Sequence, residues 1–205
     1  MVNAKENSKK AFNKQAQTYD YDIKGQHART LYPYILERIV GKSYSTILDL
    51  GCGTGKLLKM VKKKEPYIKT YGIDISENMI LIAKKQLQNT AELVLGDSEH
   101  LPFENSKFDA VYCNDSFHHY PAPKEVVAEV SRVLKPDGIF IICDCWQPFL
   151  ARSIMNFYMK HSNEGDVRMY SEKEIRTILA SRFCEIKWRR ISHNAYMILG
   201  QNCKL

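Results

Sequence analysis

The sequence lacks several features that would place it in other classes of protein. It has no run of about 18 apolar residues, which a membrane-spanning helix needs, and its first ten residues are polar, without the apolar stretch of a secretion signal. It has no repeat, low-complexity tract or linker-like segment. It also has no Cys-x-x-Cys pair among its six cysteines. We therefore expect a cytoplasmic protein whose cysteines are mostly buried free thiols rather than disulfide or zinc ligands.

The length and composition favour a single folded unit. The chain has 205 residues, of which 44% are hydrophobic, enough for one substantial core and of the order of one α/β domain. We therefore expect residues 1–205 to form one domain.

The net charge of +7 raises the question of a nucleic-acid partner. Much of the charge lies in the region 182–190 and on five lysines between residues 56 and 64, which alternate with apolar residues as on an amphipathic helix. A solvated helix face explains such a pattern, because charge alone specifies no partner. We therefore do not expect nucleic acid as the partner, although an RNA or membrane footprint stays open as the alternative.

Helical and strand-like periodicities alternate along most of the chain. Helices are expected at 11–19, 26–40, 55–64, 77–89, 123–134 and 171–181, and strands at 46–50, 69–74, 92–95, 108–113, 139–143, 183–190 and 195–201. The short apolar strands suit a buried parallel sheet, and the last two are close enough to pair as an antiparallel hairpin. The pattern is that of an α/β protein.

A glycine-rich turn follows the first expected strand. Asp49 ends the apolar run, and glycines follow at Gly51, Gly53 and Gly55. Glycine lets a ligand lie against the backbone, and the next helix offers free N–H groups. The third glycine comes one residue earlier than in the G-x-G-x-x-G fingerprint of dinucleotide sites, which argues against NAD.

At this turn the sequence resembles the class I S-adenosylmethionine-dependent methyltransferases, whose first motif is an acid followed by G-x-G-x-G. The run Leu134-Lys135-Pro136-Asp137-Gly138 is similar to the motif that ends the fourth crossover helix in the small-molecule group, which includes the ubiquinone- and menaquinone-pathway enzymes. The resemblance implies a Rossmann-like, seven-stranded, mostly parallel sheet of order 3-2-1-4-5-7-6, with the last strand antiparallel and helices on both faces. It also implies that the N-terminal helices, residues 1–41, belong to the substrate cover.

The cofactor is expected to be S-adenosylmethionine. Asp74 ends the second strand, where an acid accepts hydrogen bonds from ribose hydroxyls, and the resemblance implies that Asp97 and Ser98 meet the adenine. Asp49 is expected to order the glycine loop or to meet the methionine amino group, and Ile75 and Met79 either flank the adenine or belong to the core. The expected cofactor-binding residues are Asp49, Gly51, Cys52, Gly53, Gly55, Asp74, Ile75, Met79, Asp97, Ser98 and Asn114.

Two adjacent histidines, His118 and His119, follow the fourth strand. A neutral imidazole can accept a proton near neutral pH, so either is a candidate general base, although packing explains them as well. Adjacent side chains seldom face the same way, so at most one is expected to reach the substrate. Asp115, Asp144 and the two histidines could also ligate a metal, but nothing in the sequence shows that they converge, and no metal is expected.

The acceptor is expected to be a small molecule. Its candidate contacts are Tyr19, Phe117, Trp146, Arg152 and Tyr170. The Pro-Pro-Tyr element of amino-methylating enzymes is absent after the fourth strand. An RNA methyltransferase and a non-catalytic S-adenosylmethionine-binding regulator remain as alternatives.

Overall fold

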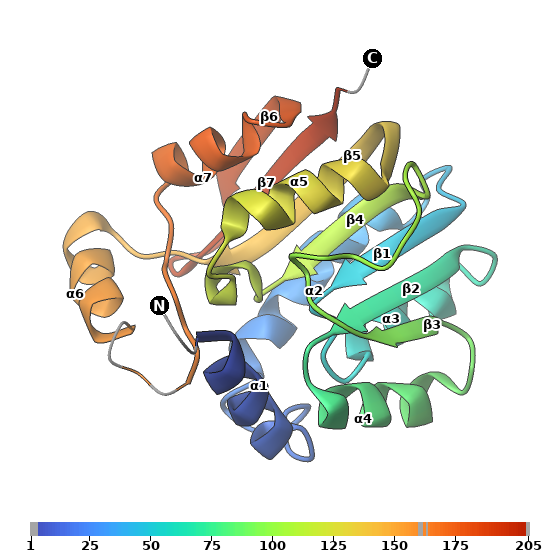
Figure 1. The fold of residues 1–205 in the computed structure, drawn as a ribbon, viewed down its shortest axis with the longest axis horizontal. Coiled ribbons are helices and arrows are strands. Elements are labelled where there is room, and N and C mark those ends of the chain that lie inside the picture. Colours follow the sequence, from blue (N-terminus) through green and yellow to red (C-terminus); the bar gives the residue numbers. More distant parts are fainter. Residues whose placement is uncertain (1–3, 160–161, 163, 204–205) are drawn as a thin grey trace.

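The computed structural model describes residues 4–159, 162 and 164–203 and forms a seven-stranded sheet (Figure 1). The strand order is β3-β2-β1-β4-β5-β7-β6, with β7 antiparallel to both of its neighbours and the other pairs parallel. The strands are β1 (Thr46–Leu50), β2 (Lys69–Asp74), β3 (Glu92–Leu95), β4 (Phe108–Asn114), β5 (Leu134–Cys145), β6 (Phe183–Arg190) and β7 (Ala195–Asn202). The predicted fold class, including the strand order and the antiparallel last strand, is confirmed.

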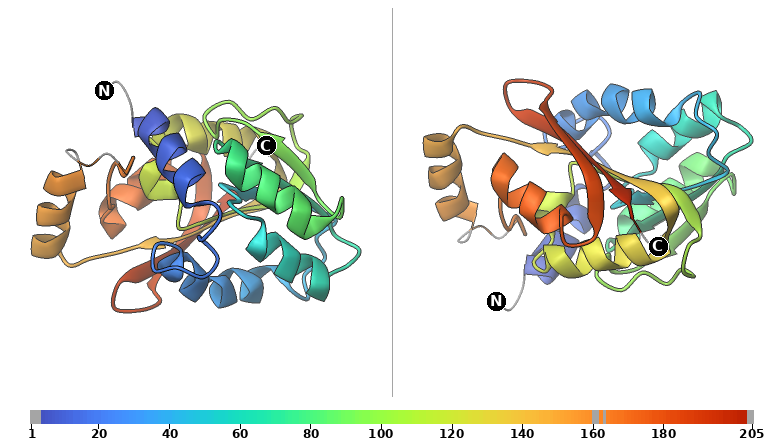
Figure 2. Two further views of the ribbon diagram at one scale, coloured as in Figure 1. Left: turned by 90° about the horizontal axis from the view of Figure 1, so that it is seen from below. Right: turned by 90° about the horizontal axis from the view of Figure 1, so that it is seen from above.

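Helices pack on both faces of this sheet (Figures 1 and 2). Apolar side chains of α5 (Pro123–Val133) and α7 (Glu172–Leu179) join one core cluster, and those of α2 (Gln26–Ile39), α3 (Lys56–Lys64) and α4 (Glu77–Leu87) join the other. Strand β4 contributes alternate residues to the two clusters, Val111 to one and Tyr112 to the other. This period of two is what a strand buried on both faces requires.

Capping interactions fix two of these helices where the sequence predicts them to begin. The Ser76 side chain accepts from the Met79 N–H at the start of α4. Ser171 and Glu174 form a complete capping box at the start of α7. Each cap satisfies N–H groups that the first turn of a helix leaves without partners.

Three elements differ from the expectation. The first helix, α1, spans Ala4–Gln15 instead of 11–19, and β5 begins at Leu134 instead of 139. A further helix, α6 (Phe149–Met159), forms where no element was expected. Helix α1 is too polar to show an apolar stripe and is held by tertiary ion pairs, which local patterns do not report. Residues 1–3 of the predicted N-terminal cover lie outside the described residues.

Helix α6 stands apart from the body of the molecule (Figure 1). None of its residues is buried, and its exposed apolar side chains are Phe149, Leu150, Ile154, Met155, Phe157 and Tyr158. Within the described part of the chain, no helix combines the length and apolarity that crossing a bilayer would take.

Cys184 and Cys203 form a disulfide, whereas the other four cysteines are free, so that most of the cysteines are free thiols as expected. Cys184 lies on β6 opposite Gln201 of β7, so the antiparallel register brings Cys203 beside it, with the two Cα atoms 6.0 Å apart. The pairing depends on strand register and not on sequence spacing. Cys52, Cys113, Cys143 and Cys145 are free.

Candidate functional site

Two adjoining cavities lie at the carboxyl ends of β1, β2 and β4. The empty space in them, including the part open to solvent, is about 510 and 480 Å³. Asp49, Asn114 and Asp115 line the first cavity, and Asp97 and Ser98 line the second. The residues common to both are Phe12, Gly51, Asp74 and Ser116. The two cavities are therefore halves of one cleft, which the Phe12 ring of α1 divides.

The glycine-rich turn forms the floor of this cleft. Gly51 has a φ of +76°, and a Cβ there would lie 2.2 Å from the Ser116 Oγ, so only glycine fits. Gly53 (φ +52°) donates its N–H to the Asp74 carboxylate over 2.8 Å. Gly55 is the left-handed residue before α3 and does not line either cavity. The turn thus presents backbone directly to the cleft, as its sequence predicts, while the third glycine serves the start of the helix.

Asp74 lies at the junction of the two cavities. Its carboxylate accepts from the N–H groups of Gly53, at 2.8 Å, and Ser76, at 2.9 Å. Burial raises its pKa, while these backbone hydrogen bonds act in the opposite direction. A carboxylate has about four lone-pair sites, so Asp74 can accept two further donors from a ligand. This geometry suits ribose hydroxyls.

The first cavity also exposes polar groups that lack partners. The side-chain oxygen of Asn114 is buried and accepts no hydrogen bond, while its amide donates to the Ala28 carbonyl over 3.1 Å. Asp49 is 2% exposed, and burial raises its pKa well above the ordinary range. A buried carboxyl beside an amide oxygen that accepts no hydrogen bond suits a cationic amino group. Cys52 and Met79 line the same cavity.

The second cavity is lined by Ile75, Asp97 and Ser98, and their contact with adenine stays a prediction. Lys5 of α1 lies there as well, and its ammonium contacts the Asp97 carboxylate at 2.6 Å and also bonds to Glu99. Lys5 was not predicted from the sequence. It lies 92 positions before Asp97, and no local sequence pattern links the two residues.

The two candidate base residues lie beside the cleft, on the 3₁₀ turn η1 (Phe117–His119). His119 lines the second cavity and packs edge-on against Phe12, whereas His118 lines neither cavity. His118 Nδ1 lies 2.6 Å from Asp144, whose charge raises the histidine pKa well above 6.5 despite opposing burial. Burial, together with the charge of His118, lowers the pKa of His119 to about 4. Neither imidazole lines the first cavity.

A different histidine approaches the first cavity. Asp115 lines it, and Nδ1 of His27, from α2, lies 2.7 Å from the Asp115 carboxylate. Asp115 has a φ of +54°, a left-handed conformation that aspartate tolerates better than most residues. Burial lowers the pKa of His27 and the Asp115 carboxylate raises it, with a net rise above 6.5. Sequence reasoning missed this pair.

The predicted acceptor contacts are only partly brought together. Tyr19 lines the first cavity. Phe117 and Tyr170 are buried against each other in the hydrophobic core, with ring centroids 5.7 Å apart, so neither faces the cleft. Trp146 packs at the edge of that core beneath Arg190, and Arg152 donates to the Gln147 carbonyl at the start of α6. The burial of Phe117 and Tyr170 corrects the expectation that they contact the acceptor, whereas Trp146 and Arg152 stay predictions.

Residues 48–142 of the chain match the family described as a methyltransferase domain. The demethylmenaquinone methyltransferase of Thermotoga maritima is 33% identical over 129 residues, which are 62% of this chain and 56% of that protein. The malonyl-[acyl-carrier protein] O-methyltransferase of Priestia megaterium is 32% identical over 67% of this chain and 50% of that protein. The chain spans about half the length of the curated relatives it matches.

Solved structures show the same fold at lower identity. A chain from the complex of the Haloferax volcanii Trm112 methyltransferase activator with a methyltransferase superposes with a TM-score of 0.82, at 18% identity, over 97% of this chain and 98% of that one. Phosphoethanolamine N-methyltransferase 2 of Haemonchus contortus, with S-adenosylhomocysteine bound, gives 0.74 at 16% identity over 85% of this chain and 53% of that one. The [4+2]-cyclase SpnF superposes with a TM-score of 0.73 at 19% identity, over 87% of this chain and 82% of that one. The fold by itself is compatible with more than one reaction.

Proposed function

We propose that this protein transfers the methyl group of S-adenosylmethionine to a small-molecule acceptor. The position of Asp74 between the two cavities, beside the glycine turn, carries this proposal, because it suits a ribose with a nucleobase on one side and an amino acid on the other. Curated relatives named for methylating demethylmenaquinone and malonyl-[acyl-carrier protein] support the small-molecule class.

The residues of the cleft fit the three parts of the cofactor. Asp97 and Ser98 would hold the adenine, Asp74 the ribose, and Asp49 with Asn114 the methionine amino group. The cofactor supplies an activated methyl group, which an acceptor displaces in line. The protein then needs to align the acceptor and exclude water, since little covalent chemistry is asked of it. Phe12 and Tyr19 line the cleft from the N-terminal segment and supply that exclusion.

Proton removal is assigned to Asp115 with His27, instead of His118 or His119. Asp115 lines the first cavity, on the methionine side, where the methyl group would lie. Its carboxylate can accept the proton of a hydroxyl or similar acceptor group, and the His27 imidazole holds it in place over 2.7 Å. Of the two histidines predicted from the sequence, His119 lines the second cavity and packs against Phe12, and His118 lines neither cavity.

RNA as the acceptor is less well supported. Lys62, Lys63 and Lys64 lie in the last turn of α3, whose first turn follows the glycine loop. The lysines are therefore at the far end of the helix from the cleft. Lys62 also donates to the carbonyls of Pro66 and Ile68, at 2.7 and 2.8 Å. RNA binding would need basic residues beside the opening of the cleft, and these lysines do not lie there.

A cytoplasmic location is part of the proposal. The buried thiols of Cys52, Cys113 and Cys143 support it, because reduced cysteines persist in that compartment. The Cys184–Cys203 disulfide is the observation against it. The redox state of these two cysteines in protein purified from its own cells, measured by thiol alkylation and mass spectrometry, tests the location.

Ligand identification followed by turnover tests the proposed function. We expect mass spectrometry to find S-adenosylmethionine or S-adenosylhomocysteine retained through purification. We then expect a panel of quinols, phenols and carboxylic acids to contain an acceptor that releases S-adenosylhomocysteine. Methyl transfer to a defined RNA nucleotide would overturn the small-molecule class. Cofactor binding without methylation of small molecules or RNA would favour a non-catalytic S-adenosylmethionine-binding regulator.

A further inference from the structure

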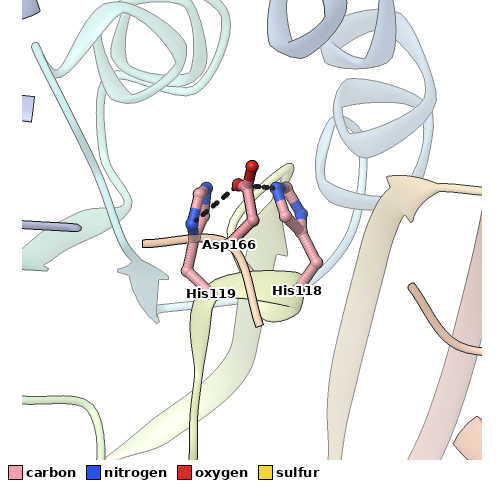
Figure 3. A group of neighbouring side chains, drawn as sticks. All are labelled: His118, His119 and Asp166. Carbon is pink, nitrogen blue, oxygen red and sulfur yellow. Dashed lines mark ion pairs between the residues drawn. The ribbon is translucent and has the colours of Figure 1, made fainter. Parts of the chain in front are cut away.

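Three potential metal ligands converge beside the cleft. His118 and His119 come from η1, and Asp166 comes from the segment between α6 and α7 (Figure 3). One ligand atom from each lies within 4.8 Å of the other two. The adjacent histidines were expected to face different ways. Instead the tight 3₁₀ turn directs both rings to one side, with centroids 4.0 Å apart.

The three ligand atoms do not hydrogen-bond to one another. The Asp166 carboxylate oxygen lies 3.6 Å from His118 Nε2 and 3.3 Å from His119 Nδ1. His119 Nδ1 is buried and makes no hydrogen bond. Both histidine side chains are 11% exposed and that of Asp166 is 24% exposed. An unpartnered nitrogen in such a place costs free energy unless something else binds it.

These separations suit a shared metal ion. Zinc binds imidazole nitrogen and carboxylate oxygen at about 2.0–2.2 Å, which in a tetrahedron separates neighbouring ligand atoms by about 3.3–3.6 Å. The two measured separations, 3.3 and 3.6 Å, fall in this range. Two imidazoles with one carboxylate favour a transition metal over magnesium or calcium, which prefer oxygen ligands alone.

The other face of His118 has the partner that a ligating histidine requires. Its Nδ1 lies 2.6 Å from the Asp144 carboxylate, which leaves Nε2 directed to the shared position. Asp144 is 1% exposed and also accepts the backbone N–H groups of His118 and Cys145, at 3.0 and 2.6 Å. A histidine held by a carboxylate in this way is oriented for metal binding.

The backbone also fixes Asp166 against the turn. The N–H groups of Val167 and Arg168 both donate to the His118 carbonyl, at 2.9 and 3.1 Å. On the other side, Gly165 has a φ of +84° and packs so closely on Ser8 of α1 that a Cβ would lie 2.3 Å from the Ser8 nitrogen. Asp166 is therefore held between two fixed points and is not a chance approach of a surface acid.

We propose that His118 Nε2, His119 Nδ1 and Asp166 bind one divalent transition-metal ion of the zinc type. The three protein ligands leave a fourth position for water or an oxygen or sulfur ligand. The ion joins η1, which borders the cleft, to the segment that connects α6 to the body of the protein. This site is independent of the proposed methyl transfer, because metal binding is measured without turnover.

The test is metal binding by the full-length protein after treatment with a chelator. We expect one equivalent of Zn²⁺ by equilibrium dialysis and elemental analysis, a Co²⁺ form with the visible absorption of a tetrahedral site, and a rise in Tm on adding Zn²⁺. Asp166→Asn should weaken binding by about 100-fold or more and abolish the rise in Tm. Asp144→Asn should weaken it by about 10- to 100-fold through the orientation of His118.

Two matched variants separate this site from other ligands. His193→Asn changes an exposed histidine in the β6–β7 turn, and Cys145→Ser removes the thiol close to His118. Both should keep stoichiometric binding. Because Asp166 is only partly buried, the Asp166→Asn protein should fold, and its melting curve without metal checks this. Binding that survives Asp166→Asn, or that Cys145→Ser removes, would overturn the proposal, as would the absence of stoichiometric binding in the wild type.

Discussion

The Lys5 ammonium lies 2.6 Å from the Asp97 carboxylate and joins the first helix to the end of the third strand. Farther along α1, Asn13 accepts from Ser76 at 2.6 Å and from the Asn78 N–H at 3.1 Å. Phe12, between these two attachments, lines both cavities. Helix α1 thus lies across the cleft as a cover that is attached at both ends.

The first prediction concerns this cover. Lys5→Ala should raise the dissociation rate of S-adenosylhomocysteine about two- to fivefold, the effect of losing its partly exposed ion pairs with Asp97 and Glu99. Surface plasmon resonance measures the rate. Lys10→Ala is the control, because Lys10 is on the same helix but pairs only with Glu6 on the exposed side. An unchanged rate in Lys5→Ala would show that the ion pairs do not retain the ligand.

The second prediction concerns the ribose. Asp74→Ala should weaken S-adenosylhomocysteine binding by about 1.5–3 kcal/mol, roughly 10- to 150-fold, the range of hydrogen bonds to charged groups. Calorimetry measures this loss, and wild-type protein should show no binding of NAD. Because Asp74 also accepts from the Gly53 N–H, displacement of the glycine loop would weaken binding as well. A second measurement compares adenosine with its 2′,3′-dideoxy analogue as competitors. The wild type should discriminate between them and the variant should not.

The sheet and the part of the cleft lined by Gly51 and Asp74 could be predicted because their signals are local. Gly51 and Gly53 belong to one continuous motif, and Asp74 ends an apolar strand about twenty residues later. The alternating apolar residues of β4 similarly identify a strand buried on both faces. In each case neighbouring residues determine the backbone shape that makes the site.

Contacts that join distant segments of the chain could not be predicted from the sequence. His27 reaches Asp115 across 88 positions and Lys5 reaches Asp97 across 92. Asp166 follows a segment without periodicity and is placed by the packing of Gly165 on α1. Phe117 and Tyr170 were predicted to contact the substrate because they are aromatic, but both are buried in the hydrophobic core.

The third prediction concerns proton removal by Asp115 and His27. Asp115→Asn tolerates the left-handed backbone but removes the carboxylate, and with a protonated acceptor it should lower kcat by about 10²-fold or more. Cofactor affinity should change little. The matched variant His118→Asn should retain turnover in the presence of saturating cofactor. A loss of turnover in His118→Asn but not in Asp115→Asn would instead assign the general base to His118 of η1.

The pH dependence of the same reaction gives a fourth prediction. The charges acting on His27 are those of Asp115, Asp144 and His118, and its net pKa lies above 6.5. A protonated His27 paired with the Asp115 carboxylate makes that carboxylate a weaker base, so kcat/KM should rise with pH through the raised pKa of His27 and level off above it. His27→Gln should remove this rise of kcat/KM with pH. A rise that persists unchanged in the variant would show that another group titrates in this range.

The last prediction concerns the stability of the sheet. Asp109, at the start of β4, accepts from the N–H groups of Ser45 and Thr46, both at 2.8 Å, and pairs with Lys135 at 2.7 Å. Burial alone would raise the pKa of Asp109, but Lys135 and the hydrogen bonds hold it well below its usual range. Asp109→Asn should therefore lower the free energy of unfolding by about 1–3 kcal/mol at pH 7.

The pH dependence of this loss follows from the direction of the shift. A carboxyl with a depressed pKa in the folded state stabilises the protein fully above its unfolded pKa of about 3.9 and loses that effect as the pH falls towards the folded value. The difference between wild type and Asp109→Asn, measured by urea unfolding, should be constant from pH 8 to pH 5 and shrink below pH 4. Asp137→Asn, an exposed acid that accepts only from Gln201 at 2.9 Å, should change stability by less than about 0.5 kcal/mol. A difference that grows as the pH falls would show that the ionised Asp109 carboxylate is not its source.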